Sequence, residues 1–188
     1  VNFHIRRIGK IRRYIDSDTC AKVINATVTS RLDYHNALLA GIPDKYLRPL
    51  QLAQNKAARL LAGTRRHEHI QPTLEHLHWL PVKQRVTFKV LTLIHKSLHD
   101  PNSPQYVKDM FTTYTPARAL RSSEDPWKLV VPRSGRLKRD RCVQVLGAKL
   151  WNTLPASLRG HESVQSFKEQ LKTILFPTVP SSCIRRLL

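Results

Sequence analysis

Apolar positions at the start of the chain recur at the spacing of an amphipathic helix over residues 3–15. The stripe expected to face a core consists of Ile5, Ile8, Ile11 and Ile15. Three cations fall at i, i+4 and i+7 on another face, and these are Arg6, Lys10 and Arg13. The segment is therefore predicted to dock by its isoleucines and to carry a basic ridge on its outer side.

Two more helices are predicted before residue 64. Ser17 or Asp18 is placed to cap the first of them, which is expected to run through residue 39 and to stop at Gly41. The next is expected to open at Pro43 and to end at Gly63. Three helices joined by short turns predict a small antiparallel bundle.

Helical patterns continue beyond residue 64, but prolines interrupt them. Pro72 starts a short helix that Pro81 ends, and Ser163 is placed to cap the last helix. The patch at 88–94 is apolar almost all round, so the middle of its helix is expected to be buried. Beyond the short helix after Pro72, helices are expected at 82–98, 105–111, 142–151 and 164–175.

Residues 112–141 are the least regular part of the chain. Residues 127–131 lie between two prolines and are expected to form one short edge strand. Tyr114 and Trp127 are candidates to stack on nucleic-acid bases, although burial is the commoner fate of such rings. The cations of this part that are candidates for phosphate contacts are Arg121, Arg133, Arg136, Lys138, Arg139 and Arg141.

The expected fold class is therefore mainly α. A small helical bundle at 1–63 is followed by a helical region at 64–176, with a short strand and an irregular basic loop at 112–141. The tail at 177–188 shows no clear pattern and is expected to be unstructured.

The charge of the chain points to a polyanionic partner. The 188 residues include 32 Lys plus Arg against 13 Asp plus Glu, which gives a formal net charge of +19. Solubility does not require such an excess of one sign, so nucleic acid is the leading candidate. An anionic membrane surface is the weaker alternative because the charge is spread along the whole chain. No run approaches the ~18 apolar residues of a membrane-spanning helix.

Residue types that carry catalysis or bind metals are present but scattered. Polymerases and nucleases need carboxylates that converge on a divalent metal. The only acidic residues that lie close together in this sequence are interpreted as a helix cap and as part of a loop. His95 and His99 share a helix face at i, i+4, but no further ligands accompany them, so surface or nucleic-acid-facing histidines are the favoured interpretation. We therefore expect no catalytic residue, no metal and no cofactor.

Seven strings occur together and in order, and they resemble a known family. The chain is similar, over about residues 3–176, to the carboxy-terminal part of the reverse transcriptase of non-LTR retrotransposons, the LINE elements of the jockey, CR1 and L2 type. The strings are SRLDYHNALLAGIP at 30–43, LQLAQNKAARL at 50–60, LHWLPV at 77–82, LRSS at 120–123, VPR at 131–133, LWNTLP at 150–155 and SFK at 166–168.

This resemblance implies a thumb at roughly 3–63 and a carboxy-terminal region after it. The parent would be an RNA-directed DNA polymerase, but its endonuclease and the metal-binding aspartates of its palm have no counterpart here. The chain alone is therefore expected to be no enzyme. Because a thumb grips the template–primer duplex, the implied partner is an RNA–DNA hybrid or duplex DNA, and charge alone does not choose between them.

Two alternatives stay open at this point. The chain is also interpretable as a helical interaction module whose apolar face, including Ala57, Ala58 and Leu61, docks on a missing palm domain. It is further interpretable as a decayed element fragment without a selected role. The three widely spaced cysteines favour a reducing compartment, and the amino terminus lacks the order of a signal peptide. The expected location is intracellular, and nuclear if the chain is functional.

Overall fold

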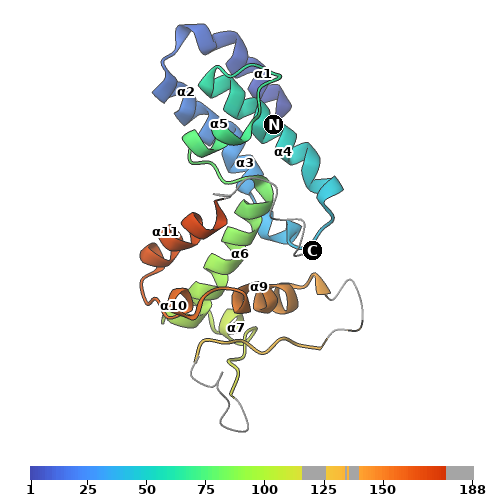
Figure 1. The fold of residues 1–188 in the computed structure, drawn as a ribbon, viewed down its shortest axis with the longest axis vertical. Coiled ribbons are helices and arrows are strands. Elements are labelled where there is room, and N and C mark those ends of the chain that lie inside the picture. The colour runs from blue at the N-terminus through green and yellow to red at the C-terminus, as the bar shows by residue number, and fades with distance from the viewer. Residues whose placement is uncertain (116–125, 134, 136–139, 177–188) are drawn as a thin grey trace.

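The computed structural model describes residues 1–115, 126–133, 135 and 140–176. Its helices form two groups along the long axis of the molecule, and α6 (Val82–His99) runs from the upper group down through the lower one (Figure 1). The upper group contains α1 (Asn2–Ile11), α2 (Ser17–Ile24), α3 (Ser30–Asp33), α4 (Asp44–Ala62) and α5 (Gln71–His76). The lower group contains α7 (Gln105–Lys108), α9 (Ala148–Asn152), α10 (Ala156–Arg159) and α11 (Val164–Leu175). The fold is mainly α, as the hydrophobic pattern predicts.

The core of the upper group is aliphatic. Ile5 and Ile8 of α1 pack against α2 and α4, which confirms the predicted docking face for these two positions. Ile11 is 45% exposed, contrary to the prediction, because two successive i+3 steps on an α-helix place it about 120° around the axis from Ile5. The remaining buried members of this core are Cys20, Ile24, Val28, Leu32, Ala53, Ala57 and Leu61.

The second helix differs from its prediction at both ends. Asp16 caps it, because its carboxylate accepts a hydrogen bond from the backbone N–H of Thr19 at 2.9 Å, so the predicted cap at Ser17 or Asp18 is wrong. The helical path passes through a π-helical turn at Asn25–Thr29 and ends at Asp33, not at residue 39. His35 then adopts a left-handed conformation with φ of 49°, and a separate 3₁₀ turn, η3, spans Asn36–Leu39.

The third predicted helix is confirmed. The helix α4 begins directly after Pro43 and ends at Gly63, whose φ of 70° gives the left-handed C-terminal position that favours glycine.

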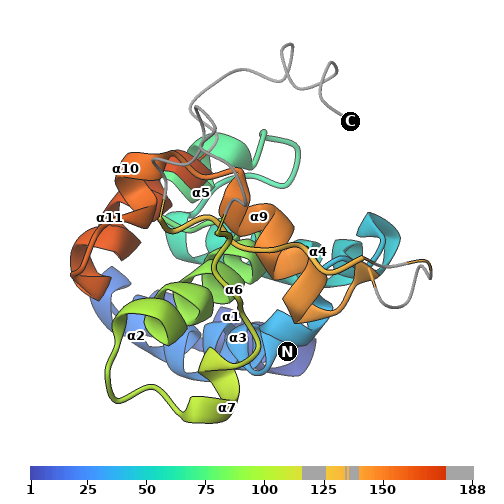
Figure 2. The ribbon, with the colours of Figure 1, turned by 90° about the horizontal axis from the view of Figure 1, so that it is seen from below.

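The lower group surrounds α6, which lies in its middle when seen from below (Figure 2). Val90, Leu91 and Ile94 are buried, as the apolar patch predicts. Trp151 of α9 and Phe167 of α11 complete the centre of this core, and both side chains are fully buried. Ser163 caps α11 as predicted, because its hydroxyl accepts a hydrogen bond from the N–H of Ser166 at 3.4 Å.

The predicted strand at 127–131 does not form. Within the described residues this stretch makes one isolated antiparallel bridge, between Thr113 and Leu129. The amide of Asn152 takes the place of a strand partner, since it donates to the carbonyl oxygen of Leu129 and accepts from the Leu129 N–H. A side chain of α9 therefore satisfies the backbone that a second strand would otherwise pair.

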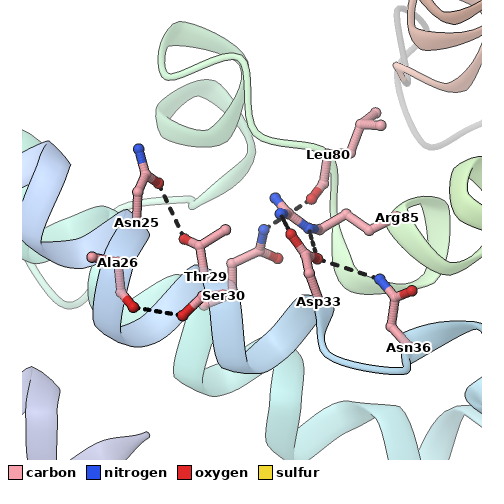
Figure 3. Close-up of polar contacts among 9 residues, drawn as sticks. Asn25, Ala26, Thr29, Ser30, Asp33, Asn36, Leu80 and Arg85 are labelled. Carbon is pink, nitrogen blue, oxygen red and sulfur yellow. Dashed lines mark hydrogen bonds and ion pairs between the residues drawn. The ribbon is translucent and has the colours of Figure 1, made fainter.

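Side chains from distant parts of the sequence join the two groups (Figure 3). Arg85 of α6 donates through Nε and Nη2 to both carboxylate oxygens of Asp33, at the end of α3, with 2.8 Å between Nε and Oδ1. The same Oδ1 accepts a hydrogen bond from Nδ2 of Asn36. This bidentate pair links the end of α3 to α6, and beyond it the chain turns so that Ala37 and Ala40 pack on the core of the lower group.

None of the helices in the described parts of the chain is long and apolar enough to cross a membrane.

Candidate nucleic-acid interface

The outer face of α1 and of the 3₁₀ turn that follows it, Arg12–Tyr14, carries four exposed cations. Arg6, Lys10 and Arg13, which the sequence pattern predicts, are all exposed, and Arg7 lies beside them. Residues 1–15 contain no Asp or Glu. Within the described residues none of the four cations forms an ion pair, so their charge remains available to a ligand. We call the set Arg6, Arg7, Lys10 and Arg13 the α1 ridge.

Arg12 lies in the same basic run but has a structural role. Its guanidinium donates to the carbonyl oxygens of Leu60 and Leu61, both at 3.3 Å, in the last turn of α4. It also donates to the carbonyl oxygen of Ile15 and to the hydroxyl of Ser17, both at 3.0 Å. These bonds satisfy helix-end carbonyls and fix the turn that follows α1. Arg12 is therefore not counted in the ridge. Its substitution is a control for substitutions of the ridge cations, because it is expected to affect stability.

The electrostatic surroundings of α1 are positive. The pKa of His4 lies below its usual value, first because of desolvation and then because of the charges of Arg31, the terminal amine and Arg7. Arg31 belongs to α3, so a neighbouring helix adds to the positive field along α1. A field of this sign favours an anionic ligand over a cationic one.

Two aromatic rings lie at the ends of the ridge, and the sequence analysis did not single them out. Phe3 is 61% exposed and Tyr14 is 72% exposed. The guanidinium of Arg7 lies 5.1 Å from the centre of the Phe3 ring, and that of Arg13 lies 4.7 Å from the centre of the Tyr14 ring. Their register relative to Arg7 and Lys10, at i, i+4, i+7 and i+11, was the signal available in the sequence.

The second predicted basic surface is described only in part. Arg133 and Arg141 are exposed, and the stem of Arg141 lies close to Gly41, where an added Cβ would meet its Cγ at 3.3 Å. The structure does not bring these two residues to the α1 ridge, because α1 packs in the upper group and the segment after residue 141 packs on α6 and α9. The other predicted residues of this surface lie outside the described residues, and they are Arg121, Arg136, Lys138 and Arg139.

The interpretation of His95 and His99 as surface residues is wrong. His95 is fully buried, its Nε2 donates to the carbonyl oxygen of His161 at 2.6 Å, and its ring stacks on Phe167. Burial lowers the pKa of His95 to about 4, so the side chain is neutral near pH 7. The Nε2 of His99 donates to the carbonyl oxygen of Arg159, and its ring lies 4.0 Å from that of Trp127. Both histidines stabilise the lower group, and Trp127 packs against its neighbours in the same way.

The acidic side chains are mostly engaged in local contacts. Asp16 caps α2, Asp18 pairs with Lys22, and Asp33 pairs with Arg85. Asp44 and Asp140 each pair with a lysine. Among the described residues, no group of three or more His, Cys, Asp or Glu side chains is close enough to hold a metal ion.

A cavity of about 330 Å³ lies beside the Asp33–Arg85 pair. Phe88 and Leu80 supply apolar walls, and Lys89 and Lys172 bring positive charge from α6 and α11. The guanidinium of Arg85 is already bound by Asp33, so this arginine is no candidate for a phosphate contact.

Comparison of the chain with known proteins gives no match among family models, curated proteins or solved structures.

Proposed function

We propose that this chain is a non-catalytic nucleic-acid-binding part of the RNA-directed DNA polymerase of a non-LTR retrotransposon. In this role it grips a template–primer duplex or target DNA. The observation that carries the proposal is the α1 ridge, since Arg6, Arg7, Lys10 and Arg13 are exposed on a segment that contains no acid. The resemblance of the ordered sequence strings to the thumb and carboxy-terminal region of such enzymes supports the same function.

The ridge is suited to phosphate rather than to base edges. Its cations lie along one side of α1 and its 3₁₀ extension, so they can follow one strand of a nucleic-acid backbone. Binding of this kind releases counterions and depends little on sequence. The core beneath the ridge, formed by Ile5 and Ile8, holds α1 against α2 and α4 and so fixes the spacing of the cations before the ligand arrives.

The proposal includes the absence of polymerase and nuclease activity in the chain alone. The carboxylates of Asp16, Asp33 and Asp140 come from three separate elements and are engaged in a cap and two ion pairs. Purified chain is expected to give no primer extension and no strand cleavage with Mg²⁺ or Mn²⁺. Extension above the level of a preparation from cells that carry the empty vector would contradict this part of the proposal.

The experiment for binding is a salt titration with a fluorescent RNA–DNA hybrid and a DNA duplex of the same sequence. If the four ridge cations each neutralise a phosphate, log Kobs falls against log salt with a slope of about −3 to −4 for duplex DNA. Affinity therefore drops steeply between about 50 and 200 mM salt. A flat response with both duplexes would overturn the proposal.

The alternative function is docking on a palm domain, and the residues predicted to form its docking face are not accessible. Ala57 and Ala58 are fully buried and Leu61 is 8% exposed, so these residues belong to the interior of the upper group. A docking surface would have to use other apolar side chains, and Leu38 and Leu52 are exposed at 75% and 50%. Light scattering distinguishes the two functions, because association of the chain without nucleic acid favours the docking alternative.

A further inference from the structure

We infer that Phe3 and Tyr14 stack on unpaired bases, so that the α1 ridge binds single-stranded RNA or DNA in preference to a fully paired duplex. This inference rests on the proposed nucleic-acid binding and names the form of nucleic acid that the ridge takes.

The first observation is that two large rings are left outside the core. The buried core of the upper group contains aliphatic side chains and Cys20, with Trp79 partly buried against it, and neither Phe3 nor Tyr14 belongs to it. Phe3 and Tyr14 are instead 61% and 72% exposed, each next to a cation of the ridge. An exposed aromatic face in water is available to a flat apolar partner, and a nucleobase offers such a face.

The second observation is that each ring already has a cation beside it. Arg7 lies over Phe3 and Arg13 lies over Tyr14, at 5.1 and 4.7 Å from the ring centres. When a base stacks on either ring, the guanidinium beside that ring can therefore reach the phosphate of the same nucleotide. This pairing of aromatic and cationic groups is the arrangement that binds single strands without sequence preference.

The distance between the two rings matches the length of a short single strand. Eleven residues separate Phe3 from Tyr14, which corresponds to roughly 17 Å along α1 and its 3₁₀ extension. At the stacked spacing of one strand, about 3.4 Å, this length spans about five nucleotides. Arg6 and Lys10 lie between the two rings in the sequence and are exposed, so we expect them to contact the phosphates of the intervening nucleotides.

A duplex cannot make the same contacts. Its bases cover one another's faces, so only phosphates, sugars and base edges are open to an approaching helix. The ridge cations still contact the duplex backbone, but Phe3 and Tyr14 have no base face to bind. The rings therefore add affinity only where bases are unpaired.

The test compares the binding of two fluorescent strands of about ten nucleotides, measured by anisotropy. One strand is an oligothymidylate, and the other has the same length but carries abasic residues instead of thymidines. Both carry the same phosphates, so they differ only in the bases. We expect the wild-type chain to bind the thymidylate strand at least ten-fold more tightly. In Phe3→Ala/Tyr14→Ala the preference should disappear while the salt dependence stays.

The control variant is Tyr34→Ala/Tyr106→Ala, which removes two rings that are 76% and 73% exposed on other elements. It is expected to keep the wild-type preference. All variants are checked for folding by circular dichroism. Because the substituted side chains are exposed, the variants are expected to unfold at the same temperature as the wild type.

The outcomes separate the two proposals. Steep salt dependence with equal binding of both strands overturns the inference on Phe3 and Tyr14 but leaves the proposed function standing. A preference that persists in Phe3→Ala/Tyr14→Ala also overturns the inference. Absence of salt-dependent binding to any strand or duplex overturns both.

Discussion

The two helical groups differ in whether aromatic rings lie at the centre of their cores. The upper group builds its core from aliphatic side chains such as Ile24 and Val28, and leaves Phe3 and Tyr14 on its surface. The lower group buries Trp151 and Phe167 at its centre. An aromatic ring supplies a large apolar area in either place, but it stabilises the fold only when it is buried. Phe3 and Tyr14, which lie beside cations of the ridge, are therefore expected to matter for binding, and Trp151 and Phe167 for stability.

The largest expected effect breaks the lower core. Trp151→Ala should lower the free energy of unfolding by about 3–5 kcal/mol, because it leaves a cavity and removes the hydrogen bond from the Trp151 indole N–H to the carbonyl oxygen of Trp127. The matched change in the upper group, Phe3→Ala, should alter it by no more than about 0.5 kcal/mol. Urea denaturation measures both. Equal losses in the two variants would contradict the contrast between the groups.

The next effect is a pH dependence that arises in the lower group. Burial holds the pKa of His95 at about 4, the hydrogen bond to His161 opposes this shift, and the charges of His99 and His161 add to it. The unfolded chain has the ordinary value near 6.5 and so binds the proton more readily than the folded chain does. The contribution of neutral His95 to the free energy of unfolding is therefore fully present above pH 6.5. It is lost as the pH drops toward 4, by about 3 kcal/mol in total.

Substitution of the histidine tests the source of this slope. His95→Gln removes the titrating group and keeps a donor for the His161 carbonyl, so the loss of stability between pH 6.5 and 4 should become much smaller. His67→Gln, at an exposed position, should leave the slope unchanged. A wild-type slope that survives in His95→Gln would show that another group is responsible.

A smaller effect separates two adjacent arginines in the upper group. Arg12→Ala should cost about 1–2 kcal/mol of stability, since it removes donors from the carbonyl oxygens of Leu60 and Leu61. Arg13→Ala should change stability by no more than about 0.5 kcal/mol and should weaken nucleic-acid binding instead. Thermal unfolding and anisotropy on the same two proteins distinguish these roles. If Arg13→Ala is the less stable variant, the assignment of the ridge is wrong.

Local sequence signals predicted the helices that have strong caps and clear periodicity. Gly63 marked the end of α4, and Ser163 marked the start of α11, because in each case the signal lies within the element itself. The contact that holds the end of the second helix against α6 comes from Arg85, which lies 52 residues away from Asp33, so no local pattern indicated it. The expected strand failed for a similar reason, since Asn152 of α9 takes up the backbone of Leu129.

The candidate site was predicted in part. The spacing of Arg6, Lys10 and Arg13 indicated an exposed face, and all three side chains are exposed on α1 and its 3₁₀ extension. Periodicity does not tell which cation of a basic run a neighbouring helix end will bind, so the role of Arg12 emerged only from its bonds to α4. The burial of His95 had an available signal, since it continues the apolar stripe of Phe88, Leu91 and Leu98 at helical spacing.

The most direct test of the account compares two triple variants that remove the same charge. Arg6→Ala/Lys10→Ala/Arg13→Ala removes three ridge cations, and Lys83→Ala/Lys89→Ala/Lys96→Ala removes three exposed lysines of α6. The measurement is the salt dependence of binding to one nucleic acid. The account predicts that the slope of log Kobs against log salt falls by roughly three in the ridge variant and by less than about one in the α6 variant. Equal changes in the two variants would show that net charge alone drives binding and would contradict an interface on α1.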